Sequence, residues 1–136
     1  MFPIVIKSNR ISSNGRNWPL VVIIRKDLNF PAAVLAQEIY ESKWKTNPKN
    51  WLEYFTDDGK RKMEIFGHEV ETVTANLIYG ADIPSYRRRE AISMVRNYKI
   101  FKNCSVAGVE TAMREVNHKA TEWVNKNIKR LRKDIF

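Results

Sequence analysis

The hydrophobic pattern changes character about a quarter of the way along the chain. Two short β-branched runs come first, at residues 4–6 and 20–24, with the turn signal Asn14-Gly15 between them. This arrangement predicts a β-hairpin. From Pro31 onward, apolar residues recur at spacings of three and four, which is the period of an amphipathic helix.

The helical part divides into four predicted helices. The first has Asn29 as a candidate cap, begins at Pro31 and ends near Lys45. Residues 51–55 form an aromatic connector or short helix, and residues 57–59 form a turn before the second long helix, which ends at Gly80. The third runs from about residue 84 to 98, and the fourth begins after Ser105. Strands followed by helices predict an α+β fold, and 136 residues fit one domain over residues 1–136.

Polar residues gather on one side of each of the first two long helices. At about 100° per residue, the residues that lie opposite the apolar stripes are Gln37, Glu38, Glu41, Glu64, His68 and Glu71, while Glu69 flanks its stripe. Such faces fit a polar cleft between the two helices, and they fit two solvated outer faces equally well.

Four segments follow one another in an order that resembles a known family. They are I-I-R-K-D-L at residues 23–28, A-Q-E-I-Y-E at 36–41, W-L-E-Y-F at 51–55 and G-H-E-V-E-T at 67–72. Their order and spacing resemble small zincin-like metallopeptidase domains, including compact ones common in bacteriophage genomes. The resemblance covers roughly residues 1–80, which leaves residues 81–136 as a basic helical part, and it implies a minimal zincin-like fold.

The resemblance also shows what this chain lacks. The family's helix reads A-H-E-x-x-H, in which two histidines bind zinc and the glutamate is the general base. Here Gln37 and Glu41 stand at the histidine positions, Glu38 stands at the base position, and Glu69 or Glu71 matches the third ligand. Because a carboxamide is a poor zinc ligand, we expect no zinc peptidase of the usual form and no obligatory cofactor.

A divalent metal ion is the alternative for the same residues. Glu38 and Glu41 on one helix could face His68 and Glu71 on the next, a donor set that suits Mn²⁺, Fe²⁺ or Zn²⁺. In a hydrolase built on this site, Glu38 would be the catalytic base.

Charge is distributed unevenly. Residues 1–83 contain 11 Lys or Arg and 10 Asp or Glu, whereas residues 84–136 contain 13 and 5, so that +8 of the net +9 lies in the second part. The candidate binding residues there are Arg87, Arg88, Arg89, Arg96, Lys129, Arg130, Arg132 and Lys133. Three arginines at a helix start oppose the helix dipole, and arginine suits phosphate, which favours a nucleic acid or an acidic protein surface as partner. Two solvated Lys/Arg-rich helices are the alternative.

The overall expectation is a non-proteolytic, zincin-like phage protein that acts by binding. A virion or host protein is the expected setting, and a purely structural virion component is a further alternative. The N-terminus lacks the features of a signal peptide and no apolar run is long enough for a membrane span, so we expect the host cytoplasm or the virion, with no membrane partner. A single cysteine fits a reducing compartment. The oligomeric state is left open.

Overall fold

The computed structural model describes residues 2–80 and 83–135. Strands come first: β1 (Ile4–Ser8), β2 (Gly15–Trp18) and β3 (Val21–Arg25). The helices that follow are α1 (Pro31–Thr46), α2 (Trp51–Tyr54), α3 (Asp57–Tyr79), α4 (Arg88–Arg96) and α5 (Val106–Ile135). Short 3₁₀ turns lie between them at η1 (Pro48–Asn50), η2 (Pro84–Tyr86) and η3 (Lys99–Phe101). The predicted α+β class is confirmed.

The sheet differs from the predicted hairpin. β3 is the central strand, with β1 parallel to it on one side and β2 antiparallel on the other. The two β-branched runs therefore pair in parallel, and the hairpin is formed by β2 and β3 instead. The turn signal at Asn14-Gly15 leads into β2, whose sequence Gly-Arg-Asn-Trp is too polar to be recognised as a strand.

The ends of α1 and α3 depend on contacts that the sequence predicted only in part. Asn29 does not cap α1, because Phe30 occupies the N-cap without a side-chain bond. The hydroxyl of Tyr79, at the far end of α3, instead accepts a hydrogen bond from the Ala32 N–H at 2.9 Å. Residues 57–59 are the first turn of α3 rather than a separate turn, because the Thr56 hydroxyl caps the helix there.

Other boundaries agree with the sequence. Gly80 ends α3 with a φ of 109°, a conformation that favours glycine. Ser105 caps α5 through the Gly108 N–H. The predicted third helix is shorter than expected, since α4 is flanked by η2 and η3, and the short helix α2 brings the described helices to five rather than four.

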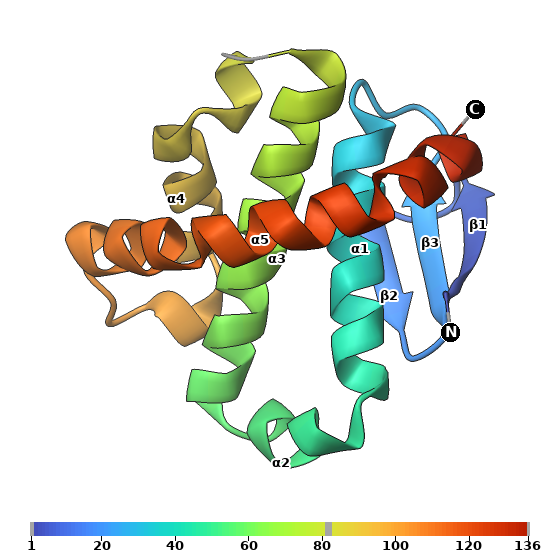
Figure 1. Cartoon of the computed structure of the whole chain (residues 1–136). Coiled ribbons are helices and arrows are strands. Elements are labelled where there is room, and N and C mark those ends of the chain that lie inside the picture. Colours follow the sequence, from blue (N-terminus) through green and yellow to red (C-terminus); the bar gives the residue numbers. More distant parts are fainter. Residues whose placement is uncertain (1, 81–82, 136) are drawn as a thin grey trace.

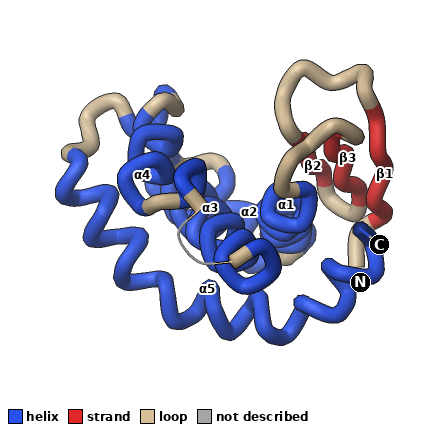
Figure 2. The backbone as a smooth tube through the Cα atoms, turned by 90° about the horizontal axis from the view of Figure 1, so that it is seen from above, coloured by secondary structure: helices blue, strands red, loops and turns tan. Residues whose placement is uncertain are grey.

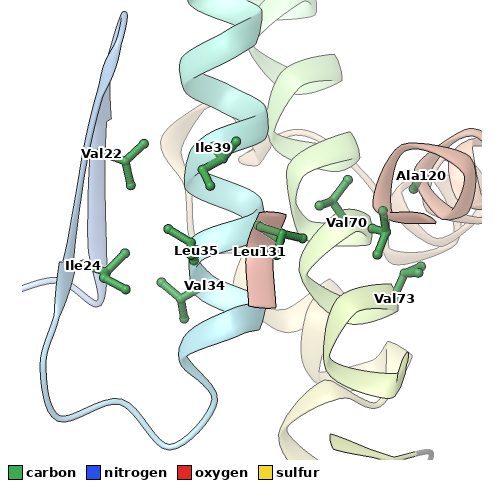
Figure 3. Packing of buried hydrophobic residues seen from close by; sticks show 11 residues of the cluster. Val22, Ile24, Val34, Leu35, Ile39, Val70, Val73, Ala120 and Leu131 are labelled. Carbon is green, nitrogen blue, oxygen red and sulfur yellow. The ribbon is translucent and has the colours of Figure 1, made fainter. Parts of the chain in front are cut away.

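The elements form successive layers, which Figures 1 and 2 show from two directions. α1 covers one face of the sheet, α3 lies antiparallel beside α1, and α4 lies on the far side of α3. The long helix α5 runs across α4, α3 and α1, and its C-terminal end reaches β1 (Figure 1). The main core fills the space between these layers, as Figure 3 shows. Its fully buried members include Val22, Ile24, Leu35, Ile39, Val70, Val124 and Leu131.

A buried ion pair joins α3 to α4 and α5. Glu69 is fully buried, and its carboxylate accepts two hydrogen bonds from the Arg88 guanidinium at 2.9 and 3.2 Å. The Asn117 amide of α5 donates a third at 3.0 Å. Arg88 therefore has a structural role in this fold.

This pair generates a stability prediction. Arg88→Ala should lower the free energy of unfolding by about 3 kcal/mol, because Glu69 would be left buried without its cation. Urea unfolding followed by circular dichroism measures the effect. Arg89→Ala is the matched control, since the Arg89 side chain is 86% exposed and such a change costs within about 0.5 kcal/mol. Identical unfolding curves for the two variants would contradict the prediction.

Candidate functional site

A cluster of buried ionisable side chains lies between α1 and α3. We call it the carboxylate cluster, and it consists of Glu38, Glu41, Glu64, His68 and Glu71. The four candidate metal residues of the sequence analysis all belong to it. The polar faces of the two helices are thus turned toward each other rather than toward solvent.

His68 lies at the centre of the cluster and is 2% exposed. Its Nδ1 is 3.5 Å from Glu71 Oε2, and its Nε2 is 3.7 Å from Glu64 Oε2. The Gln37 amide nitrogen lies 3.4 Å from the same Nε2 and donates to Glu41 Oε1 at 3.3 Å. Glu64 Oε2 is buried and has no hydrogen-bond partner.

Strand β2 supplies the polar contacts on the α1 side. The Asn17 amide nitrogen donates to Glu38 Oε2 at 2.6 Å and to Glu41 Oε2 at 2.7 Å. Lys45 in turn donates to Asn17 Oδ1 at 2.6 Å. One asparagine therefore bridges two carboxyl groups and links them to the nearest lysine.

Glycines allow the backbone to approach the carboxyl groups closely. A Cβ at position 67 would lie 2.9 Å from Glu41 Oε1, and a Cβ at position 15 would lie 2.8 Å from Glu38 Cγ. Both distances are shorter than real Cβ contacts, so any larger residue would displace the glutamates. Gly67 on α3 and Gly15 on β2 thus define the space that the cluster occupies.

Burial changes the acidity of the cluster. It raises the pKa of Glu38 from the ordinary 4.5 to about 8, and the charge of Glu41 adds to the rise. Burial also raises the pKa of Glu41, with a further contribution from Glu64. The charges of His68 and Lys45 oppose that rise. Neutral carboxyl groups are thus favoured in this environment.

The structure distinguishes the two candidates for the third-ligand position. Glu71 points to the cluster, where it contacts His68. Glu69 lies on the opposite side of α3, in its ion pair with Arg88. Only Glu71 is therefore in position to act together with Glu38 and Glu41.

Two tyrosines from the C-terminal part border the cluster. The Tyr86 hydroxyl donates to Glu71 Oε1 at 3.2 Å, and the ring centroid of Tyr98 is 5.8 Å from that of His68. Burial, followed by the charges of the neighbouring glutamates, raises the pKa of Tyr98. A cleft of about 310 Å³, whose walls include Glu71, Tyr86 and Arg25, leads from the surface to this end of the cluster.

Sequence reasoning did not identify Asn17, Lys45, Tyr86 or Tyr98 as members of the site. Asn17 belongs to the strand that was not predicted, and Tyr98 stands at the end of the predicted third helix, where nothing in the sequence marked it as part of a site. Asn17, Tyr86 and Tyr98 lie outside α1 and α3 in the sequence, and Lys45 lies near the C-terminal end of α1. No local spacing could have brought them together.

The basic residues of the second part of the chain do not form one surface. Arg87, Arg88 and Arg89 stand at the start of α4, where Arg88 and Arg89 line a hollow with Val106 and Glu110 of α5. Lys129 to Lys133 belong to the C-terminal end of α5, which lies next to the sheet (Figure 1). Arg88 shares Glu69 with Asn117 of α5, and Lys129 lies twelve residues further along that helix, a rise of roughly 18 Å at 1.5 Å per residue. Arg88 is held by Glu69, and the Arg130 guanidinium stacks on the Phe2 ring at 4.8 Å. Arg96, Lys129, Arg132 and Lys133 are exposed.

The carboxylate cluster is not in a metal-binding arrangement. Within residues 2–80 and 83–135, no three His, Cys, Asp or Glu side chains are already placed to hold a metal ion. The amides of Asn17 and Gln37 hold carboxyl oxygens of the cluster in this arrangement. Binding of an ion would therefore require these side chains to move.

In the part of the chain that the structure describes, no helix combines the length and apolar character needed to cross a bilayer.

Comparison with protein-family models, with curated proteins and with solved structures finds no match. The likeness to zincin-like domains therefore rests on the four sequence segments alone.

The raised pKa values give a pH prediction for the protein without added metal. Between pH about 5 and 8 the folded state holds more protons than the unfolded state, so stability is greatest at the acidic end and falls as pH rises toward 8. The slope is about 1.4 kcal/mol per pH unit for each extra proton held. Urea unfolding in a chelating buffer across this range measures it.

The double variant Glu38→Gln/Glu41→Gln should flatten this dependence and be the more stable protein near pH 8. Glu115→Gln is the control, because Glu115 is exposed on α5. A wild-type protein whose stability rises steadily from pH 5 to 8 would show that the cluster is charged in the folded state.

Proposed function

We propose that the carboxylate cluster is a binding site for one divalent metal ion in a zincin-like domain that has lost the peptidase histidines. The observation that carries this proposal is the burial of three carboxyl groups, those of Glu38, Glu41 and Glu71, together with one imidazole, with Glu64 partly exposed beside them. Burying ionised carboxylates is costly unless they are paired or bind a metal. Among the described residues, Lys45 is hydrogen-bonded to Asn17, which in turn donates to Glu38 and Glu41.

The donor set fits such an ion. Carboxylate oxygens with one imidazole nitrogen suit Mn²⁺, Fe²⁺ or Zn²⁺, and Glu64 Oε2, 3.7 Å from His68 Nε2, is a further buried oxygen beside this imidazole. Glu41, His68 and Glu71 are the residues that would hold the ion, with Glu64 beside them. Rotation of the Gln37 and Asn17 amides would free the oxygens that they now occupy.

A bound divalent ion would supply Lewis acidity toward an oxygen atom of water or substrate. Glu38 is the residue that could hold or release a proton there, because its pKa of about 8 lies close to neutral pH. Tyr86 orients Glu71 by its hydrogen bond, and the cleft beside these two residues gives access from solvent. A metal-dependent hydrolase is the activity compatible with these roles, and a non-catalytic ion site in a pseudoenzyme is the alternative.

Titration calorimetry with Mn²⁺ or Zn²⁺ on chelator-treated protein tests the proposal. We expect close to one equivalent bound, with affinity that rises with pH because protons compete for the ligands. His68→Ala and Glu41→Gln should each weaken binding by roughly tenfold or more. At a metal concentration of about 100 Kd the wild-type fold should gain about 2.7 kcal/mol.

His118→Ala is the matched control, because His118 is exposed on α5 with its Nε2 3.0 Å from Glu122. Equal affinities for the His68 and His118 variants would place the ion elsewhere. A Glu38→Gln variant distinguishes a metal-dependent hydrolase from a non-catalytic ion site, since it should retain the metal and lose any hydrolytic activity.

A second candidate function is the binding of a polyanion by the exposed cations at the C-terminal end of α5. Arg132 and Lys133 are exposed there, close to Lys129. Lysine and arginine contacts to phosphate give affinity that does not depend on sequence and that weakens with salt. Nucleic acid in a phage particle is the partner that fits this proposal.

Binding of a single-stranded oligonucleotide at several salt concentrations tests this second candidate. Arg132→Ala/Lys133→Ala should weaken binding and reduce the slope of log K against log salt by about 0.7 for each phosphate that the variant no longer neutralises. Arg114→Ala is the control, since Arg114 is exposed but pairs with Glu110. An unchanged slope in the double variant would remove this candidate.

A further inference from the structure

The outer face of the sheet, turned away from α1, is apolar and open to solvent. The register places two rows of side chains on it, Ile4–Val21–Trp18 and Ile6–Ile23–Arg16. Ile4 is 67% exposed, Ile6 45% and Trp18 47%. The other face carries Val5, Val22 and Ile24 and is covered by α1 and the end of α5 (Figure 2).

The sequence of these strands is typical of a sheet that is covered on both sides. β1 begins Ile-Val-Ile and β3 begins Val-Val-Ile-Ile, without the alternation of polar and apolar residues that a half-exposed sheet shows. The two strands pair in parallel, within a mixed sheet whose third strand is antiparallel. Their apolar runs are typical of strands that are covered on both faces, and here one face lies open to solvent.

Leu20 provides an independent observation at the end of the same face. It is 41% exposed and has a φ of 69°, a left-handed conformation that is unfavourable for leucine and suits glycine. Its carbonyl accepts the Ile4 N–H at 2.8 Å, which places Leu20 beside the first residue of β1. An exposed leucine in this conformation is better explained by a contact that its side chain makes than by the turn itself.

The charge around this face indicates the character of a partner that could cover it. The first thirty residues contain five Lys or Arg and one Asp. Arg16 lies on this face, and Arg10 and Lys26 are exposed in the adjoining loops. Asp27 is bound by Arg25 at 2.6 Å. A second copy of this chain packed face to face would bring these cations together, whereas an acidic partner would neutralise them.

We propose that the outer sheet face is the docking surface for an amphipathic, acidic α-helix of a partner protein. A helix laid across the sheet would bury its apolar stripe on the isoleucine and valine rows, and its flanking carboxylates would meet Arg16 and the surrounding cations. An apolar face of branched side chains offers little to the phosphates of a nucleic acid, which favours a protein. The surface lies on the opposite face of the sheet from the carboxylate cluster and shares none of its residues.

A synthetic amphipathic helix with a leucine stripe flanked by glutamates is the probe, with binding followed by fluorescence anisotropy. The same peptide with lysines in place of glutamates, and one with its leucines scattered around the helix, are the peptide controls. We expect the acidic peptide to bind at least roughly tenfold more tightly than either control. Isoleucine methyl resonances should report contact at Ile4, Ile6 and Ile23.

Variants identify the surface. Ile4→Thr/Ile6→Thr keeps β-branched residues in β1 and should weaken peptide binding roughly tenfold. Leu20→Gly should raise or preserve the melting temperature, because it relieves the left-handed leucine, and yet weaken binding severalfold. Val106→Thr is the matched control, since Val106 is 47% exposed at the far end of α5.

Binding of the acidic peptide that is unaffected by the β1 and Leu20 variants would overturn the proposal, as would equal binding of the lysine peptide. Concentration-dependent dimerisation in sedimentation experiments that Ile4→Thr/Ile6→Thr abolishes would identify a second copy as the occupant and would also overturn it. If a single-stranded oligonucleotide bound the same rows more tightly than the acidic peptide, the proposal would be overturned in favour of a nucleic acid.

Discussion

The burial of several carboxyl groups between two antiparallel helices is the constraint on which the rest of this structure depends. Like charges a few ångströms apart in a medium of low dielectric repel one another by several kcal/mol, at roughly 4 kcal/mol for a pair 4 Å apart. The fold can relieve this repulsion by protons, by the charges of His68 and Lys45, or by a metal ion. The raised pKa values of Glu38 and Glu41 describe the first of these states. A divalent ion would replace the protons with a charge that the site itself lacks.

The surrounding elements are arranged so that the cluster keeps its position. α3 carries ionic contacts on two sides, since Glu71 faces α1 and Glu69 faces Arg88 and Asn117. The pair of Glu69 with Arg88 and Asn117 fixes α4 and α5 against α3, and Glu41 of α1 occupies the space left by Gly67. β2 closes the cluster from the sheet side through Asn17. Three separate packing interfaces thus hold the backbone around the cluster in place, although its side chains would still have to rotate to take up an ion.

The sequence predicted those features that depend on local periodicity. The α+β class, the start of α1 at Pro31, the end of α3 at Gly80 and the cap at Ser105 all follow from residues close to one another in the chain. The strand pairing was predicted wrongly. β1 pairs in parallel with β3, and each residue lies opposite one that is seventeen positions later in the sequence. That pairing depends on contacts between distant segments and not on the turn signal between them. The helical wheel placed the six polar residues on the correct sides of their helices. It could not decide whether those sides meet, since that depends on how α1 and α3 pack, nor could it add Asn17 and Tyr98 from other elements.

β2 connects the two proposed surfaces, because successive residues of a strand point to opposite faces. Asn17 points inward to Glu38 and Glu41, while Arg16 and Trp18 point outward onto the apolar rows. A helix docked on the outer face would therefore contact the immediate neighbours of the residue that bridges two carboxyl groups. Any displacement of β2 that lengthens the Asn17 hydrogen bonds makes those carboxyl groups available to a metal or a proton. Thermodynamic linkage then requires the converse, that occupation of the cluster alters affinity at the outer face by the same factor. This fold thus has a direct physical route by which a partner on the sheet could act on the buried carboxylates, through one strand of four residues.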